Sequence, residues 1–272
     1  MLTTQYINID GINYAYVDEG NKDKPAVLLL HGFPDSKELW FNFIPKLVEQ
    51  GYRVIAPDLK GYGDTDIPDN FDIHSSSKDL FNLLTQLDVK QAYVIGHDWG
   101  AFLGWLFTHD YPTIVKSYVA MSVGHPNGYL RYGGVSQMLK GMYAPLFLIK
   151  NVAEKALSAF DYKMLEFMDE SCTLHDNWKR RLSRPNRLTA ALNWYRRNYM
   201  MLMRGFGGVN VPTLGLIGEK DPALTVDQMA ASWHYVSNHF DYQVVQDAGH
   251  WLQITHQDEV LNHIIQFYKD RT

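Results

Sequence analysis

Cysteine is nearly absent from this chain. Its 272 residues include one cysteine, Cys172, so no disulfide forms within the chain and no cluster of thiolates holds a metal ion. Long apolar runs are also missing, since no stretch approaches the roughly 20 residues that a membrane-spanning helix requires. The segment from Met1 to Tyr6 lacks the basic and apolar regions of a signal peptide. We therefore expect a soluble, cytoplasmic protein that has no membrane partner.

An excess of positive charge is missing too. The chain has 25 Lys and Arg against 30 Asp and Glu, a formal net charge of −5 that disfavours nucleic acid as a partner. Hydrophobic residues make up 46% and charged residues 20% of the chain, which is the composition of an ordinary globular domain. No metal-binding spacing such as H-E-x-x-H occurs, so we expect neither a metal nor a cofactor.

Short apolar segments alternate with amphipathic segments along most of the chain. Residues 5–9 and 13–17 flank Asp10-Gly11, a pattern that predicts a β-hairpin. Six further segments are typical of strands buried in a parallel sheet: 26–30, 52–56, 92–95, 117–121, 213–217 and 242–245. Leucines at helical spacing within residues 80–87 predict one of the covering helices. The order predicts an α/β fold with a mostly parallel eight-stranded sheet flanked by helices.

The alternation stops between residues 126 and 210. This segment has a helical pattern rich in aromatic residues, Met and Arg, and it predicts an inserted helical cap. Residues 1–125 and 211–272 then form the core domain. From Trp178 to Arg204 the cap has many Lys and Arg but no Asp or Glu. We interpret this basic stretch as a solvated cap face, with a surface for an anionic substrate or partner as the alternative.

The strongest chemical signal is the segment from Gly96 to Gly100, which reads GHDWG. It follows a predicted buried strand and precedes a helical pattern, and its small residues suit a sharp strand-to-helix turn. Such a turn thrusts its central side chain outward, and here that side chain is Asp98. A carboxylate is ionised at neutral pH, so it attacks without a base. Attack on an ester would give an anhydride, whereas attack on a saturated carbon gives a stable ester, so we expect an alkylating substrate.

Hydrolysis of that ester requires a base to activate water and an acid to orient the base. His250 follows the last predicted strand, at the edge of the sheet where α/β sites gather, and it is the predicted base. Asp221 follows the preceding strand and is the predicted orienting acid. Glu219 and Asp247 are the alternatives for that acid.

Two backbone N–H groups are predicted to stabilise the oxyanion that forms when water attacks the ester. Phe33 lies in the segment from His31 to Pro34, directly after the predicted strand 26–30, and Trp99 follows the nucleophile. Both N–H groups are expected to face the carbonyl oxygen of Asp98. The oxyanion therefore forms on a side chain of the protein itself.

These segments together resemble the α/β-hydrolase superfamily and, within it, the epoxide hydrolases of the soluble type. The likeness spans nearly the whole chain and rests on residues 31–34, 56–65, 96–100, 191–196 and 249–251. The resemblance implies that Tyr195, in the Asn-Trp-Tyr-Arg segment of the cap, donates a hydrogen bond to an epoxide oxygen. It assigns the same role to Tyr143. It also implies a cis peptide bond before Pro34.

The resemblance further implies that Phe33, Pro34 and Trp99 line the substrate pocket. The expected reaction converts a small apolar epoxide and water into a vicinal diol through an ester on Asp98. The protein is then a hydrolase of ether bonds, a monomer or a homodimer. A haloalkane or haloacid dehalogenase with Asp98, His250 and Asp221 in the same roles is the first alternative. A catalytically silent binding module with this fold is the second.

Overall fold

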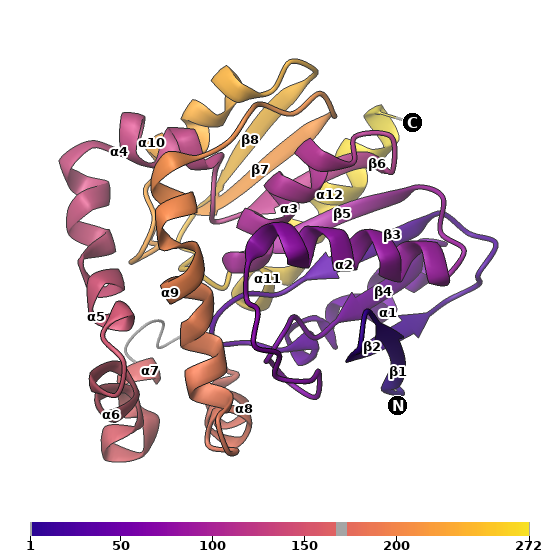
Figure 1. Cartoon of the computed structure of the whole chain (residues 1–272). Coiled ribbons are helices and arrows are strands. Elements are labelled where there is room, and N and C mark those ends of the chain that lie inside the picture. The colour runs from indigo at the N-terminus through magenta and orange to yellow at the C-terminus, as the bar shows by residue number, and fades with distance from the viewer. Residues whose placement is uncertain (1, 167–172, 272) are drawn as a thin grey trace.

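One sheet of eight strands runs through the computed structural model, which describes residues 2–166 and 173–271 (Figure 1). Its order is β1-β2-β4-β3-β5-β6-β7-β8. Strand β1 pairs antiparallel with β2, and β2 with β4, while the other five pairs are parallel. The strands are β1 (Gln5–Ile9), β2 (Ile12–Glu19), β3 (Ala26–Leu30), β4 (Arg53–Pro57), β5 (Ala92–His97), β6 (Val115–Met121), β7 (Thr213–Gly218) and β8 (Phe240–Val245). The predicted α/β class and mostly parallel sheet are confirmed.

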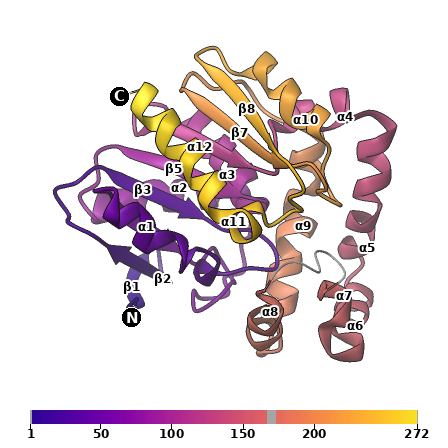
Figure 2. The same ribbon diagram turned by 180° about the vertical axis from the view of Figure 1, so that it is seen from behind.

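Helices cover both faces of the sheet. Helices α1 (Phe43–Glu49) and α12 (Gln257–Asp270) lie on one face, and α2 (Ile73–Gln86) and α3 (Trp99–Asp110) lie on the other (Figures 1 and 2). Every residue of β3 and β5 is buried, as expected of strands covered on both sides. The remaining core helices are α10 (Val226–Ala230) and α11 (Leu252–Thr255), with the 3₁₀ helices η1 (Lys37–Trp40) and η4 (Ala231–Tyr235).

The chain between β6 and β7 forms a separate group of helices to one side of the sheet (Figures 1 and 2). Its described helices are α4 (Pro126–Lys140), η2 (Gly141–Tyr143), α5 (Ala144–Leu148), α6 (Val152–Ser158), η3 (Ala159–Tyr162), α7 (Lys163–Glu166), α8 (His175–Leu182) and α9 (Arg187–Arg204). We call these helices the cap. Cys172 falls in this part of the chain but outside the described residues. None of the helices in the described ranges is both long enough and apolar enough to cross a bilayer.

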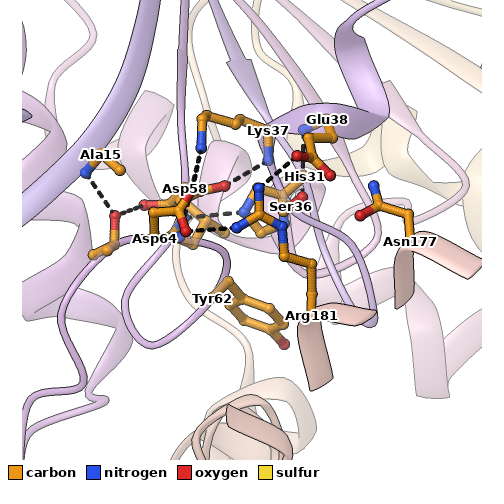
Figure 3. Close-up of polar contacts among 12 residues, drawn as sticks. Ala15, His31, Ser36, Lys37, Glu38, Asp58, Tyr62, Asp64, Asn177 and Arg181 are labelled. Atoms are coloured by element: carbon orange, nitrogen blue, oxygen red, sulfur yellow. Dashed lines mark hydrogen bonds and ion pairs between the residues drawn. The ribbon is translucent and has the colours of Figure 1, made fainter. Parts of the chain in front are cut away.

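The basic stretch of the cap is a solvated face only in part. Lys179, Arg180, Arg197 and Arg204 are exposed, but other basic side chains of the stretch pair with carboxylates. Arg181 of α8 is only 12% exposed, and its guanidinium pairs with the carboxylates of Glu38 and Asp64 in the core (Figure 3). Arg196 of α9 pairs with Glu154 of α6 at 2.7 Å. Glu38 and Asp64 are more than a hundred residues from Arg181 in the sequence, so the local pattern could not reveal them. These ion pairs attach the cap to the core and α9 to α6.

Candidate active site

Asp98 occupies a strained turn between β5 and α3. Its φ of 53° and ψ of −122° lie in a region that side-chain-bearing residues rarely adopt. A Cβ atom on Gly96 would lie 2.4 Å from the carbonyl oxygen of Gly100, and one on Gly100 would lie 2.2 Å from that of Leu30. Only glycine fits at both positions, because the turn packs directly against itself and the end of β3. The turn presents the Asp98 carboxylate, which is 13% exposed, at the start of α3.

The loop after β3 contacts this carboxylate directly. The backbone N–H of Phe33 donates a hydrogen bond of 2.7 Å to Asp98 Oδ1. A Cβ on Gly32 would lie 2.3 Å from Asp98 Oδ1 and 2.6 Å from the backbone nitrogen of Trp99, so these groups converge on one spot. The peptide bond between Phe33 and Pro34 is cis, as the resemblance implied. The structure thus brings together the two N–H groups that the sequence singled out beside the carboxylate.

His250 lies between two carboxylates. Its Nδ1–H donates to Asp221 Oδ2 at 2.8 Å, and its Nε2 lies 3.7 Å from Asp98 Oδ2. The two alternative acids lie elsewhere. Asp247 pairs with Lys220 at 2.6 Å, and Glu219 accepts a hydrogen bond from the backbone N–H of Asp247. Asp221 is therefore the acid that the fold brings to His250.

The charges of His250 and Asp221 are strongly coupled. Burial favours neutral His250, but the charges and hydrogen bonds of Asp221 and Asp98 outweigh burial and raise the pKa of His250 to about 10. Burial would also raise the pKa of Asp221. His250 and the N–H groups of Ala223 and Leu224 overcome it and hold that pKa below its ordinary value. At neutral pH His250 is therefore an imidazolium beside the Asp221 carboxylate.

Two cap tyrosines face this triad. Tyr143 of η2 and Tyr195 of α9 line the same cavity as Asp98 and His250. The Tyr195 ring packs edge-on against Trp99, with ring centroids 4.9 Å apart. Burial raises the pKa of both phenols, and the negative charge of Asp98 raises it further. Both groups therefore keep their protons and act as hydrogen-bond donors.

Two cavities meet at Asp98 and the two tyrosines. The larger has a volume of about 190 Å³ and apolar walls that include Leu146, Leu157, Met164 and Trp251. The smaller, about 50 Å³, is lined by residues that include Trp99, Phe102, Tyr129 and Leu202. Phe33 packs its ring at 5.5 Å from those of Phe147 and Tyr195, and Pro34 is buried. Within residues 2–166 and 173–271, no three His, Cys, Asp or Glu side chains are grouped so that they could hold a metal ion.

Asp35 is a site residue that the sequence reasoning missed. Its buried carboxylate accepts hydrogen bonds from the indole N–H groups of Trp178 at 2.6 Å and Trp251 at 2.9 Å. Burial raises the pKa of Asp35 to about 7, against the effect of these two hydrogen bonds. Because Trp178 belongs to cap helix α8 and Trp251 follows His250, Asp35 joins the cap to the loop that carries His250. The only local signal is its position directly after Pro34.

Comparisons with known proteins agree with this geometry. Residues 25–257 match the family model described as alpha/beta hydrolase fold. Human epoxide hydrolase 4 is 33% identical, over 98% of this chain and 79% of that protein. The crystal structure of epoxide hydrolase A from Mycobacterium thermoresistibile has a TM-score of 0.80 and 25% identity, and covers 99% of this chain and 98% of its own. An epoxide hydrolase structure from Bacillus megaterium, at 23% identity, shares the fold with a TM-score of 0.86, covering 97% of this chain and 100% of its own. The chain therefore belongs to the α/β-hydrolase fold family and, within it, to the epoxide hydrolases.

Proposed function

We propose that this protein opens an epoxide with water to form a vicinal diol, through a covalent ester on Asp98. The observation that carries the proposal is a carboxylate at the strand-to-helix turn, facing two protonated phenols across one cavity. The relatives named as epoxide hydrolases support the same reaction. The apolar walls of the larger cavity favour a small apolar epoxide.

In the first step, Asp98 Oδ2 attacks one epoxide carbon, and the bond between that carbon and the epoxide oxygen breaks. The other carboxylate oxygen, Oδ1, is held by the N–H of Phe33. Tyr143 and Tyr195 donate hydrogen bonds to the epoxide oxygen and supply the proton that neutralises the alkoxide. The imidazolium of His250, which lines the same cavity, replaces that proton. The products are a neutral alkyl ester and a neutral imidazole.

Esterification also converts His250 into a base. The Asp98 carboxylate is one of the two charges that raise the pKa of His250, and the ester removes that charge. The pKa of His250 therefore falls when the ester forms, and the neutral ring keeps its Nδ1–H bond to Asp221. His250 becomes a base at the step where water needs one.

In the second step, Nε2 of His250 takes a proton from water, and the hydroxide adds to the Asp98 carbonyl carbon. The negative charge develops on the oxygen that the Phe33 N–H contacts, next to the N–H of Trp99. Collapse of this intermediate breaks the ester bond, and the remaining water proton passes to the leaving alkoxide. The diol departs, and Asp98 and His250 return to their starting charges.

Dehalogenation by the same triad is the competing function. A halide leaving group needs hydrogen-bond donors but no proton, whereas a ring-opened alkoxide needs both. Two buried phenols whose pKa values are raised suit the alkoxide better than a halide. An assay of purified protein against epoxides, haloalkanes and haloacids separates the two functions. We expect diol without halide, and halide without diol would assign dehalogenation instead.

Trapping the ester tests the covalent scheme. His250→Gln removes the base but leaves Asp98 and both phenols, so incubation with styrene oxide should add the mass of one epoxide to the intact protein. Peptide mapping should place that mass on Asp98. The double variant Asp98→Asn/His250→Gln is the matched control and should gain no mass. An epoxide that the unmodified protein turns over, but that never adds to His250→Gln, would contradict the scheme.

A further inference from the structure

His31 lies directly behind the oxyanion loop and is fully buried. Its Nδ1 is 3.0 Å from the carbonyl oxygen of Gly32, and its Nε2 is 3.0 Å from the backbone nitrogen of Leu59. A carbonyl only accepts and a backbone N–H only donates, so Nδ1 carries the proton and Nε2 does not. Burial lowers the pKa of His31 to about 4, which keeps the ring neutral and compatible with both bonds.

The peptide group that His31 contacts is the one that serves Asp98. The carbonyl of Gly32 accepts the hydrogen bond from His31, and the N–H of the same peptide group, which belongs to Phe33, donates to Asp98 Oδ1 at 2.7 Å. Hydrogen bonds in such a chain polarise one another, so donation to the carbonyl makes the N–H a stronger donor. Together with the backbone N–H of Asp35, which donates to the same carbonyl at 2.9 Å, it also fixes the plane of the peptide and hence the direction of the Phe33 N–H.

The backbone that holds His31 is itself rigid. Leu59 follows Asp58, whose carboxylate accepts hydrogen bonds from the backbone N–H and the ammonium group of Lys37, both at 2.7 Å (Figure 3). The side chains of this ion pair are at most 1% exposed. Tyr62 packs edge-on against the His31 ring, with centroids 5.1 Å apart. The imidazole is therefore fixed in one orientation by its neighbours.

We propose that His31 is a positioning residue for the second chemical step: its Nδ1–H aligns and polarises the Gly32–Phe33 peptide, which then stabilises the oxyanion on Asp98. The inference rests on the proposed two-step function. The two steps differ in where charge moves. Negative charge leaves Asp98 during ester formation, so a stronger donor at Oδ1 gives that step no help. Charge develops on the contacted oxygen during hydrolysis, so the same donor accelerates that step.

Two substitutions separate the two ring nitrogens of His31. The amide nitrogen of asparagine takes the place of Nδ1, so His31→Asn keeps the donor to Gly32. The amide oxygen of glutamine takes the place of Nε2, so His31→Gln keeps the acceptor for Leu59 and loses that donor. We expect His31→Gln to slow ester hydrolysis about tenfold, less than loss of a whole oxyanion donor, and ester formation by less than about twofold. His31→Asn should recover most of the hydrolysis rate.

Rapid-quench reactions with styrene oxide, read by intact mass, measure both steps. The fraction of protein that carries the ester should be higher in His31→Gln than in the unmodified protein and in His31→Asn. Thr65→Val is the matched control, because Thr65 bonds the Asp58 carbonyl in the same loop without touching His31. It should lower the melting temperature but leave the ratio of the two rates unchanged.

Three results would overturn the role of His31. The first is an equal loss in both steps, and the second is an equal effect of His31→Asn and His31→Gln. The third is a ¹⁵N NMR spectrum of the unmodified protein at pH 7 in which Nδ1 of His31 lacks its proton, a readout that needs no variant to fold. If the ester forms in His250→Gln, any of these results rejects only the role of His31. If no ester forms in His250→Gln, the two-step function itself is rejected.

Discussion

The core and the cap hold their proposed catalytic groups by different means. In the core, Asp98 is fixed by its own strained backbone and by glycines whose surroundings leave no room for a Cβ atom. In the cap, Tyr143 and Tyr195 are held by aromatic packing, and outer residues of α4 such as Val135 and Met138 are 72% and 65% exposed. The proposed nucleophile is thus placed by local geometry, whereas the phenols are placed by how the cap docks onto the core.

Several polar contacts fix that docking. Arg181 reaches Glu38 and Asp64, and Trp178 reaches Asp35. Lys140 of α4 donates to the backbone carbonyl of Leu224 at 3.0 Å and also bonds the carbonyl of Asp221. The cap therefore contacts the loop that carries Asp221 as well as the loop after β3. Changes to these contacts should move the phenols while leaving the core intact.

Removal of both phenols should have the largest effect. Tyr143→Phe/Tyr195→Phe leaves the alkoxide without a proton donor, so the rate of ester formation should fall at least about a thousandfold. Each single substitution should lower it about 10- to 100-fold, because one donor remains. Single-turnover kinetics with styrene oxide measure these rates. Tyr199→Phe, also on α9, is the control and should change them less than twofold. Full activity in the double variant would show that the cap phenols take no part in the reaction.

A methyl group at Gly32 should disturb the core almost as strongly. Gly32→Ala places a Cβ on top of Asp98 Oδ1, so the carboxylate or the loop must move, and kcat/KM should fall at least about a hundredfold. Gly134→Ala in the cap is the matched control. Gly134 has a φ of 60° but open space around it, so the variant should lose about 2 kcal/mol of stability and little activity. Equal losses of activity in both variants would contradict the claim that only the core depends on this local backbone geometry.

Loss of the main cap–core ion pair should have an intermediate effect. Arg181→Met leaves Glu38 and Asp64 short of a partner, and the free energy of unfolding should fall by about 2 kcal/mol. KM for the epoxide should rise several-fold, since the cap docks less firmly. Arg180→Met is the control, because Arg180 is 58% exposed and such pairs contribute at most about 1 kcal/mol. Denaturant titrations measure the free energy of unfolding, and steady-state kinetics measure KM. Equal changes in Arg181→Met and Arg180→Met would contradict the docking role of Arg181.

The pH dependence should show the smallest change and separate the two steps. The phenol pKa values lie above the ordinary value, so the tyrosines should not titrate below pH 10. His250 has a pKa of about 10 before the ester forms, so ester formation should be level between pH 6 and 9 and slow above pH 10. Hydrolysis needs neutral His250, so its rate should rise with pH through a lower pKa. Rapid-quench kinetics across this range test both trends, and a common profile for the two steps would contradict the change in charge.

The sequence predicted the core better than the cap for a physical reason. Asp98, Asp221 and His250 each follow a strand of the parallel part of the sheet, and the carboxyl ends of such strands meet at one edge. The turn at Asp98 also has its own local signature in glycine spacing. The sequence predicted both ends of each of the eight strands to within two residues.

The cap contacts depend on residues that are distant in the sequence. The local pattern around Arg181 predicts a solvated face, because its partners Glu38 and Asp64 lie more than a hundred residues away in the core. The position of Asp35 after Pro34 does not reveal its role, since its donors Trp178 and Trp251 are 143 and 216 residues away. Only the family resemblance singled out the tyrosines. Such pairings follow from docking of two domains, which no local pattern encodes.

The most direct test of a covalent ester on Asp98 is the fate of the water oxygen in one turnover. Excess protein should be mixed with an epoxide in H₂¹⁸O, and the diol and the peptide that contains Asp98 analysed by mass spectrometry. Because water attacks the Asp98 carbonyl carbon, the account predicts ¹⁸O in the Asp98 carboxylate and an unlabelled diol after the first turnover. An ¹⁸O-labelled diol and unlabelled Asp98 would mean that water attacks the epoxide directly, and would contradict the account.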